Sequence, residues 1–254
     1  MTQKTWNEFW GEFLLVEMHR DNPIRWSSRE ERAAWIVDRL GLSSGAAVLG
    51  LGCGDGFLEI CLGRLGMRVT GVDRLEEVLA LARKEVQGEE VEFLAADLRE
   101  LECRPNSYDA VLIIETLGLM SKEDDADLIS RVATWLKPGG GLLADCPKGS
   151  EGPDSKGTRA SPVPGGRLTM TWNYDPRFRI QSITPRFERD DGTTIELMDP
   201  YDPSRGSVEG ILRYIYPISE LRSMLNEHGL VPEEVEHFSS PNYHCVIVRK
   251  REDA

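Results

Sequence analysis

A glycine-rich segment that follows a short apolar run has the clearest chemical meaning in this sequence. The segment runs from Val48 to Gly56, with glycines at positions 52, 54 and 56 and a helix expected to open at about Phe57. Glycines let the backbone approach a ligand closely, and the first turn of a helix presents free N–H groups to it. Phe57 stands where a dinucleotide fingerprint, G-x-G-x-x-G, requires glycine, so the spacing argues against a nicotinamide cofactor.

Two aspartates follow the next two apolar runs. Asp73 lies 21 residues after Gly52, where a doubly wound fold places a carboxylate that accepts hydrogen bonds from ribose hydroxyls. Asp97 follows the third run, and we expect Asp97 and Leu98 to lie beside an adenine ring. Each aspartate taken alone is equally well explained as a helix cap or a turn residue. Together with the glycines, they stand at the carboxyl ends of three successive strands and predict one shared crevice.

Glu115 and His19 are the candidates for catalytic roles. Glu115 follows the fourth apolar run, where a carboxylate can accept a proton or stabilise a developing positive charge. The alternative for Glu115 is a carboxylate that orients a cofactor or caps a helix. His19 lies in the N-terminal segment, for which a lid over the substrate is one of two interpretations. The four histidines show no metal-binding spacing such as H-x-x-x-H, so no metal site is expected.

Short apolar runs that alternate with amphipathic stretches must position these residues. Continuous apolar runs of this kind are typical of parallel strands covered by helices on both faces. The expected strands are Ala46 to Leu51, Arg68 to Val72, Val91 to Ala95, Ala110 to Ile114 and Gly141 to Ala144. The expected helices include Leu75 to Lys84 and Ala126 to Leu136, preceded by one that opens at a capping box, Ser28-x-x-Glu31, and closes at Gly41.

The alternation of strand and helix breaks after Cys146. Pro147 to Gly166 is rich in Gly, Pro and Ser and predicts a mobile loop. Strand-like alternation with turn signals then predicts antiparallel hairpins. The expected strands are Leu168 to Tyr174, Phe178 to Thr184, Pro185 to Arg189 and Thr193 to Met198, with turns at Asp175-Pro176 and Asp191-Gly192. A helix ending at His228-Gly229 and a hairpin of Val235 to Phe238 with Tyr243 to Val248 complete the chain.

The predicted fold class is α/β: a doubly wound, mostly parallel seven-stranded sheet with a C-terminal antiparallel hairpin and an inserted antiparallel β cap. We expect an N-terminal helical lid and first core helix in residues 1–44, a Rossmann-like core in 45–146 and 214–254, and the loop and cap in 147–213. Aromatic residues at helical spacing, Trp6, Phe9, Trp10 and Phe13, predict a helix that packs on the body, or alternatively a lid over a substrate.

Composition limits the functional classes. The formal net charge of −13 argues against binding to nucleic acid, because attraction to phosphates requires a positive field. No run approaches the roughly 18 to 20 apolar residues that span a bilayer, so no membrane association is expected. The five cysteines are scattered, with no C-x-x-C pair, which favours a reducing, cytoplasmic location over a disulfide framework.

Taken together, the motifs resemble class I (Rossmann-like) S-adenosylmethionine-dependent methyltransferases. The resemblance covers roughly residues 45–146 and rests on Val48 to Gly56, Gly71-Val72-Asp73, Ala96-Asp97-Leu98, Tyr108 to Val111 and Leu136 to Gly140. It implies S-adenosyl-L-methionine as cofactor and methyl transfer to a nitrogen or oxygen nucleophile. The cofactor-binding residues that it implies are Gly50, Leu51, Gly52, Cys53, Gly54, Asp73, Arg74, Asp97, Leu98, Glu115 and Thr116.

Three further segments resemble a bacterial subgroup that acts on small molecules, which implies a small-molecule methyl acceptor. They are Glu115 to Met120, Trp172 to Pro176 and Tyr216 to Gly229. One departure stands out: the family usually has Asp or Glu at position 50, where it helps to hold the methionine end of the cofactor, and this chain has Gly50. Asp55 or Glu115 is a candidate substitute. Gly50 also motivates an alternative, a noncatalytic or regulatory adenosylmethionine-binding protein of the same fold.

Overall fold

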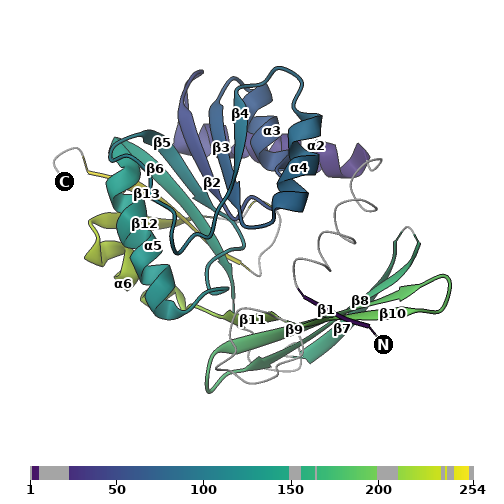
Figure 1. The fold of residues 1–254 in the computed structure, drawn as a ribbon. Coiled ribbons are helices and arrows are strands. Elements are labelled where there is room, and N and C mark those ends of the chain that lie inside the picture. The colour runs from purple at the N-terminus through teal and green to yellow at the C-terminus, as the bar shows by residue number, and fades with distance from the viewer. Residues whose placement is uncertain are drawn as a thin grey trace. The chain divides into compact units, whose positions relative to one another are not determined.

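The computed structural model of the chain describes residues 2–5, 23–148, 156–163, 165–198, 211–235, 238 and 243–251. The chain divides into two compact units. The first, which we call the core unit, comprises Pro23–Leu117, Ser121–Lys148 and Tyr216–Ala254. The second, the cap unit, comprises Met1–Asn22, Gly118–Met120 and Gly149–Ile215. Each unit is built around its own sheet (Figure 1).

Among the described residues of the core unit, seven strands form one sheet. They are β2 (Ala47–Leu51), β3 (Arg68–Asp73), β4 (Val91–Ala95), β5 (Tyr108–Ile113), β6 (Leu136–Pro147), β12 (Leu230–Val235) and β13 (Tyr243–Lys250). Their order is β12-β13-β6-β5-β2-β3-β4, with β2 to β6 parallel and β13 antiparallel to both β6 and β12. The predicted doubly wound sheet with a C-terminal antiparallel hairpin is therefore confirmed.

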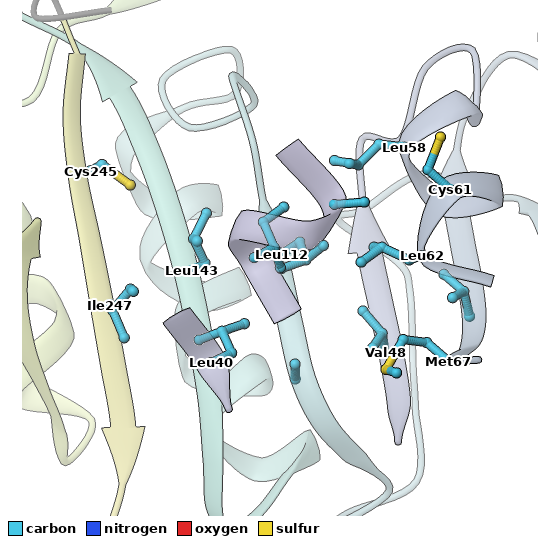
Figure 2. Close-up of a cluster of buried hydrophobic side chains, with 14 residues drawn as sticks. Leu40, Val48, Leu58, Cys61, Leu62, Met67, Leu112, Leu143, Cys245 and Ile247 are labelled. Atoms are coloured by element: carbon cyan, nitrogen blue, oxygen red, sulfur yellow. The ribbon is translucent and has the colours of Figure 1, made fainter. Parts of the chain in front are cut away.

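Five described helices cover this sheet: α2 (Pro23–Leu40), α3 (Phe57–Arg64), α4 (Glu76–Glu85), α5 (Lys122–Trp135) and α6 (Ile218–Glu227). Helices α2, α3 and α4 lie on one face, and α5 and α6 lie on the other (Figure 1). Leu40 of α2 and Leu62 of α3 pack in one cluster with Leu112 of β5 and Leu143 of β6, and all four are 1% exposed or less (Figure 2). Because both faces are covered, every residue of β2 is buried, which explains the unbroken apolar run there.

The described strands of the cap unit form a second, mostly antiparallel sheet. They are β1 (Thr2–Thr5), β7 (Lys156–Val163), β8 (Gly166–Asp175), β9 (Ile180–Arg189), β10 (Thr194–Met198) and β11 (Ile211–Tyr214). Their order is β1-β10-β9-β8-β7, and β11 pairs with β9. The inserted antiparallel sheet is confirmed, with β1 added in parallel to β10.

Two predictions in the insertion were wrong. Residues 156–163, expected to lie in a mobile loop, form β7 and pair with β8 along their whole length. A neighbouring antiparallel strand satisfies the backbone groups of this segment, so it needs few apolar side chains of its own. The two strands expected on either side of Pro185 are one strand, β9. On the edge of β9 away from β8, β11 pairs with residues 180–183 and β10 with 186–188, so Pro185 lies between the two partner strands on that edge, a position compatible with proline.

Two boundaries in the core unit also differ from prediction. Helix α2 begins at Pro23, and Ser28 lies inside it, because proline is favoured at a first helical position. Strand β12 covers Leu230–Val235 rather than 235–238, since Gly229, at φ +74°, turns the chain directly from α6 into the strand. The predicted aromatic helix at residues 6–13 lies outside the described residues. None of the described helices is long and apolar enough to cross a membrane.

Candidate functional site

The glycine-rich segment forms a tight loop between β2 and α3. Gly52, Gly54 and Gly56 adopt φ values of +69°, +54° and +68°, a left-handed conformation that favours glycine at each position. The backbone N–H groups of Gly52 and Cys53 donate to the carbonyl of Val72 at 2.8 and 3.0 Å, which ties the loop to β3. A Cβ placed on Gly54 would have no atom within 4 Å. The loop therefore leaves open space beside Gly54 for a ligand.

Thr116 packs against the beginning of this loop. A Cβ added to Gly52 would overlap Thr116 Oγ1 and lie 2.9 Å from Thr116 Cγ2. The Thr116 hydroxyl is buried and lies 3.2 Å from the carbonyl oxygen of Leu51 and 2.9 Å from that of Ile114, to which it donates. Thr116, an expected cofactor-binding residue, thus joins the ends of β2 and β5.

Gly52→Ala is expected to destabilise the core unit by about 2–4 kcal/mol, because alanine combines left-handed strain with overlap against Thr116. Gly229→Ala is the matched control: Gly229 has a similar φ of +74°, and a Cβ there would meet nothing within 4 Å. Its cost should be about 1–2 kcal/mol, from strain alone. Urea denaturation of both variants measures the difference, and equal losses would contradict the close packing of Gly52 on Thr116.

Asp73 ends β3 and holds two separate backbone segments. Its Oδ2 accepts from the N–H of Gly54 at 2.9 Å, and its Oδ1 accepts from the N–H of Leu75 at 3.1 Å. Burial raises the pKa of Asp73, and the two N–H donors and the nearby Arg74 oppose that rise. A carboxylate oxygen has more than one acceptor position, so both oxygens retain capacity for ligand hydroxyls.

Asp97 and Leu98 follow β4 and are fixed by arginines. Asp97 Oδ1 accepts from the backbone N–H and the Nε of Arg99, both at 2.9 Å, and the hydrogen bond from the Arg99 side chain lowers the pKa of Asp97. The Leu98 carbonyl accepts from Arg131 Nη2 of α5 at 2.9 Å. The segment that we expect to contact adenine is therefore held in place, and an Asp97 contact to adenine would have to share the carboxylate with Arg99.

Glu115 follows β5 with its backbone at φ +55°, which is unusual for a residue other than glycine. Its N–H donates to Asp145 Oδ1 at 2.6 Å. Asp145 lies in β6, is fully buried, and accepts at Oδ2 from Arg32 Nη2 of α2 at 3.0 Å. The ion pair therefore holds the strained backbone of Glu115, whose side chain is exposed.

A second buried acid, Glu59, lies in the first turn of α3 and is only 3% exposed. Its Oε2 atom has no hydrogen-bond partner among the described residues. Burial raises its pKa from 4.5 to about 8; Asp55 and Asp73 add to that rise, and its own backbone N–H and Arg29 oppose it. Its carboxyl group fills the space beside Gly50: a Cβ at position 50 would overlap Oε1 and lie 3.2 Å from Cδ.

Sequence reasoning missed Glu59, Asp145 and Arg32. Both acids interrupt otherwise apolar stretches, Phe57–Leu62 and Leu142–Cys146, and that interruption was the available signal. The candidate substitutes for an acid at position 50 were Asp55 and Glu115. Asp55 accepts from the N–H of Phe57 at 3.2 Å and pairs with Arg29 at 3.3 Å.

The expected cofactor-binding residues all lie at or after the carboxyl ends of β2, β3, β4 and β5. The chain leaves β2 for β3 on one side and returns to β5 on the other, and ligands bind outside such a switch point in open α/β sheets. His19 lies outside the described residues. Within the described part of the chain, no three His, Cys, Asp or Glu side chains are grouped so as to hold a metal ion.

The strand order, the antiparallel β13 and the glycine loop after β2 define the class I methyltransferase fold. Residues 48–140 match the model of a family described as a methyltransferase domain. A ubiquinone biosynthesis O-methyltransferase of Aeromonas salmonicida is 33% identical over 138 residues, which are 53% of this chain and 53% of that protein. The chain spans about half the length of the curated relatives it matches.

Solved structures share the fold over most of the chain. The CcbJ methyltransferase of Streptomyces caelestis superposes with a TM-score of 0.71 at 20% identity, over 88% of this chain and 89% of that one. CalS10, an amino pentose methyltransferase of Micromonospora echinaspora solved with bound S-adenosylmethionine, gives a TM-score of 0.66 at 18% identity, over 91% of this chain and 100% of that one. The predicted methyltransferase fold is therefore confirmed.

Proposed function

We propose that this protein is an S-adenosylmethionine-dependent methyltransferase that acts on a nitrogen or oxygen nucleophile of a small molecule. One observation carries the proposal: the carboxylate that ends β3, Asp73, is bonded to the amide of Gly54 at the open part of the glycine loop. A carboxylate that can bind ribose and a backbone segment that a ligand can approach closely therefore lie together where the strand order reverses, between β2 and β5. The family match over residues 48–140 supports the same activity.

The residues present fit this cofactor. Gly54 leaves open space, Asp73 has acceptor capacity toward ribose hydroxyls, and Glu59 offers a buried oxygen without a partner among the described residues. Asp97 and Leu98 would contact the adenine, and the backbone from Gly50 to Gly54, with Arg74, Glu115 and Thr116 around it, would surround the rest. When bound, the cofactor supplies a methyl group already activated on a sulfonium.

The remaining task of the protein is alignment and exclusion of water. Glu115 is proposed as the polar residue that receives or positions a proton of the acceptor, because its backbone is held by Asp145 while its side chain is exposed. His19 is the second proposed catalytic residue. The small-molecule acceptor is supported by the relatives, one named for ubiquinone biosynthesis and one for an amino pentose. The net charge of −13 supports the same class over nucleic acid.

Asp73→Ala is expected to weaken binding of S-adenosylhomocysteine about tenfold or more, because hydrogen bonds to a charged group contribute roughly 1.5–3 kcal/mol. Titration calorimetry measures the affinity. Asp109→Ala is the control: Asp109 also accepts from a backbone N–H, that of Ala47 at 2.8 Å, and pairs with Lys137, but it lies near the amino end of β5. The control should bind as the wild type does. Unchanged affinity in folded Asp73→Ala would overturn the ribose assignment.

Turnover distinguishes an enzyme from the noncatalytic alternative. Methyl transfer from S-adenosylmethionine to a panel of phenolic and amino-sugar acceptors, followed as S-adenosylhomocysteine release, supports the proposed function. Tight cofactor binding without release against any acceptor class would favour a noncatalytic protein.

A further inference from the structure

We propose that the carboxylate of Glu59 binds the ammonium group in the methionine part of the cofactor, in place of the acid that is absent at position 50. The proposal rests on the proposed function, because it concerns the same cofactor. The carboxylate then comes from α3, where Glu59 lies, and not from position 50 in β2.

The position of Glu59 is set by α3. It is the third residue of the helix, next to the glycine loop, where the positive end of the helix dipole favours an acid. The side chain points to the end of β2 and takes up the volume beside Gly50, with Cγ and Cδ at 3.3 and 3.2 Å from a Cβ built there. A carboxylate is thus present at the place where Gly50 lacks one.

The surroundings of Glu59 carry a surplus of negative charge. Asp55 in the loop and Asp73 in β3 both act on it, and Arg29 of α2 is the cation that opposes them. Arg29 is itself paired with Asp55 at 3.3 Å. Burying an ionised carboxylate destabilises the folded protein unless the carboxylate is paired with a cation. Glu59 is therefore suited to a ligand that brings a positive charge. The ammonium of the cofactor is such a group.

Gly50 is not required by its backbone. It has no left-handed φ, unlike Gly52, Gly54 and Gly56, so an L-residue is compatible with its conformation. The three atoms nearest to a Cβ at position 50 all belong to the Glu59 side chain. The acid can therefore stand at position 50 or at position 59, provided that the residue at the other position is small.

The first experiment measures two ligands by titration calorimetry at pH 7. S-adenosylhomocysteine carries the ammonium, and 5′-methylthioadenosine has the same adenosine and sulfur but no amino-acid part. Glu59→Gln should weaken S-adenosylhomocysteine binding roughly ten- to hundred-fold and change methylthioadenosine binding less than twofold. A purely structural role would weaken both ligands alike. Unchanged binding of S-adenosylhomocysteine would overturn the Glu59 assignment and leave the proposed function intact, whereas a wild type that binds neither ligand would overturn the proposed function itself.

The second experiment exchanges the two residues. Gly50→Asp alone should weaken S-adenosylhomocysteine binding, because its side chain meets Glu59, and Glu59→Ala alone should weaken it by loss of the carboxylate. The double variant Gly50→Asp with Glu59→Ala should bind at least tenfold more tightly than Glu59→Ala. A double variant that folds and binds no better than Glu59→Ala overturns the exchange. Glu115→Gln is tested in parallel, and a selective loss of S-adenosylhomocysteine there, with none in Glu59→Gln, would assign the ammonium to Glu115.

The third experiment detects the proton on Glu59. With its pKa raised to about 8, Glu59 is largely protonated at pH 7, and a bound ammonium favours the charged form. Binding of S-adenosylhomocysteine should then release close to one proton from the wild type, measured from the dependence of the binding enthalpy on the ionisation enthalpy of the buffer. Glu59→Gln should reduce that release to near zero. Equal release in both proteins would contradict the assignment.

Discussion

Glu59→Gln is expected to make the ligand-free protein progressively more stable than the wild type as the pH rises from 5 to 8. The pKa of Glu59 is raised in the folded state from 4.5 to about 8, mainly by burial. Between these values the unfolded chain has released the proton and the folded protein still holds it, so the wild type loses stability as pH rises. The loss is about 1.4 kcal/mol per pH unit, or roughly 4–5 kcal/mol over the interval.

Glutamine has the shape of a protonated glutamate and does not titrate, so its variant lacks this loss. Urea denaturation at half-unit steps of pH gives the free energy of unfolding of both proteins, and their difference isolates residue 59 from Asp73, whose pKa is also raised by burial. Glu76→Gln serves as the control, since Glu76 is exposed and pairs with Arg83 on the surface. A difference that stays constant between pH 5 and pH 8 would show that Glu59 ionises normally in the folded state.

Asp145→Ala is the second large effect that we expect: a loss of about 3–5 kcal/mol in the free energy of unfolding. Removing the carboxylate leaves the guanidinium of Arg32 buried without its partner. An uncompensated buried charge strongly lowers the free energy of unfolding. It also removes the acceptor from the N–H of Glu115, whose left-handed backbone that hydrogen bond holds. Urea denaturation measures the loss.

A double variant separates the two causes. Arg32→Met with Asp145→Asn removes both charges and keeps an oxygen that can accept from the Glu115 N–H. It should lose only about 1–2 kcal/mol, because no unpaired buried charge remains. If the double variant is destabilised as strongly as Asp145→Ala, the Arg32–Asp145 charge pair is not the source of the loss.

Elements with a strong local pattern were predictable. Strands β2, β5 and β6 are largely buried, so their apolar runs stood out. The residue range of β4 was also predicted without error, although only Phe93 in that strand is buried. The turns after Asp175 and Asp191 contain Pro176 and Gly192, and the preference of these residue types for turns depends only on the few neighbouring residues. β7 was missed because its pairing with β8 is decided by a neighbouring strand and not by its own composition.

The sequence by itself determined the core fold and its glycine loop, because glycine spacing, strand ends and hydrophobic period are local properties. Gly52, Gly54, Asp73 and Thr116 could be chosen from such patterns, and the structure joins them after the carboxyl ends of β2, β3 and β5. Only the tertiary structure showed that Glu59 occupies the space beside Gly50, and that Arg32 and Asp145, 113 residues apart, support Glu115. Burial and charge pairing depend on which helix packs over which strand, and the pattern of one segment does not contain that information.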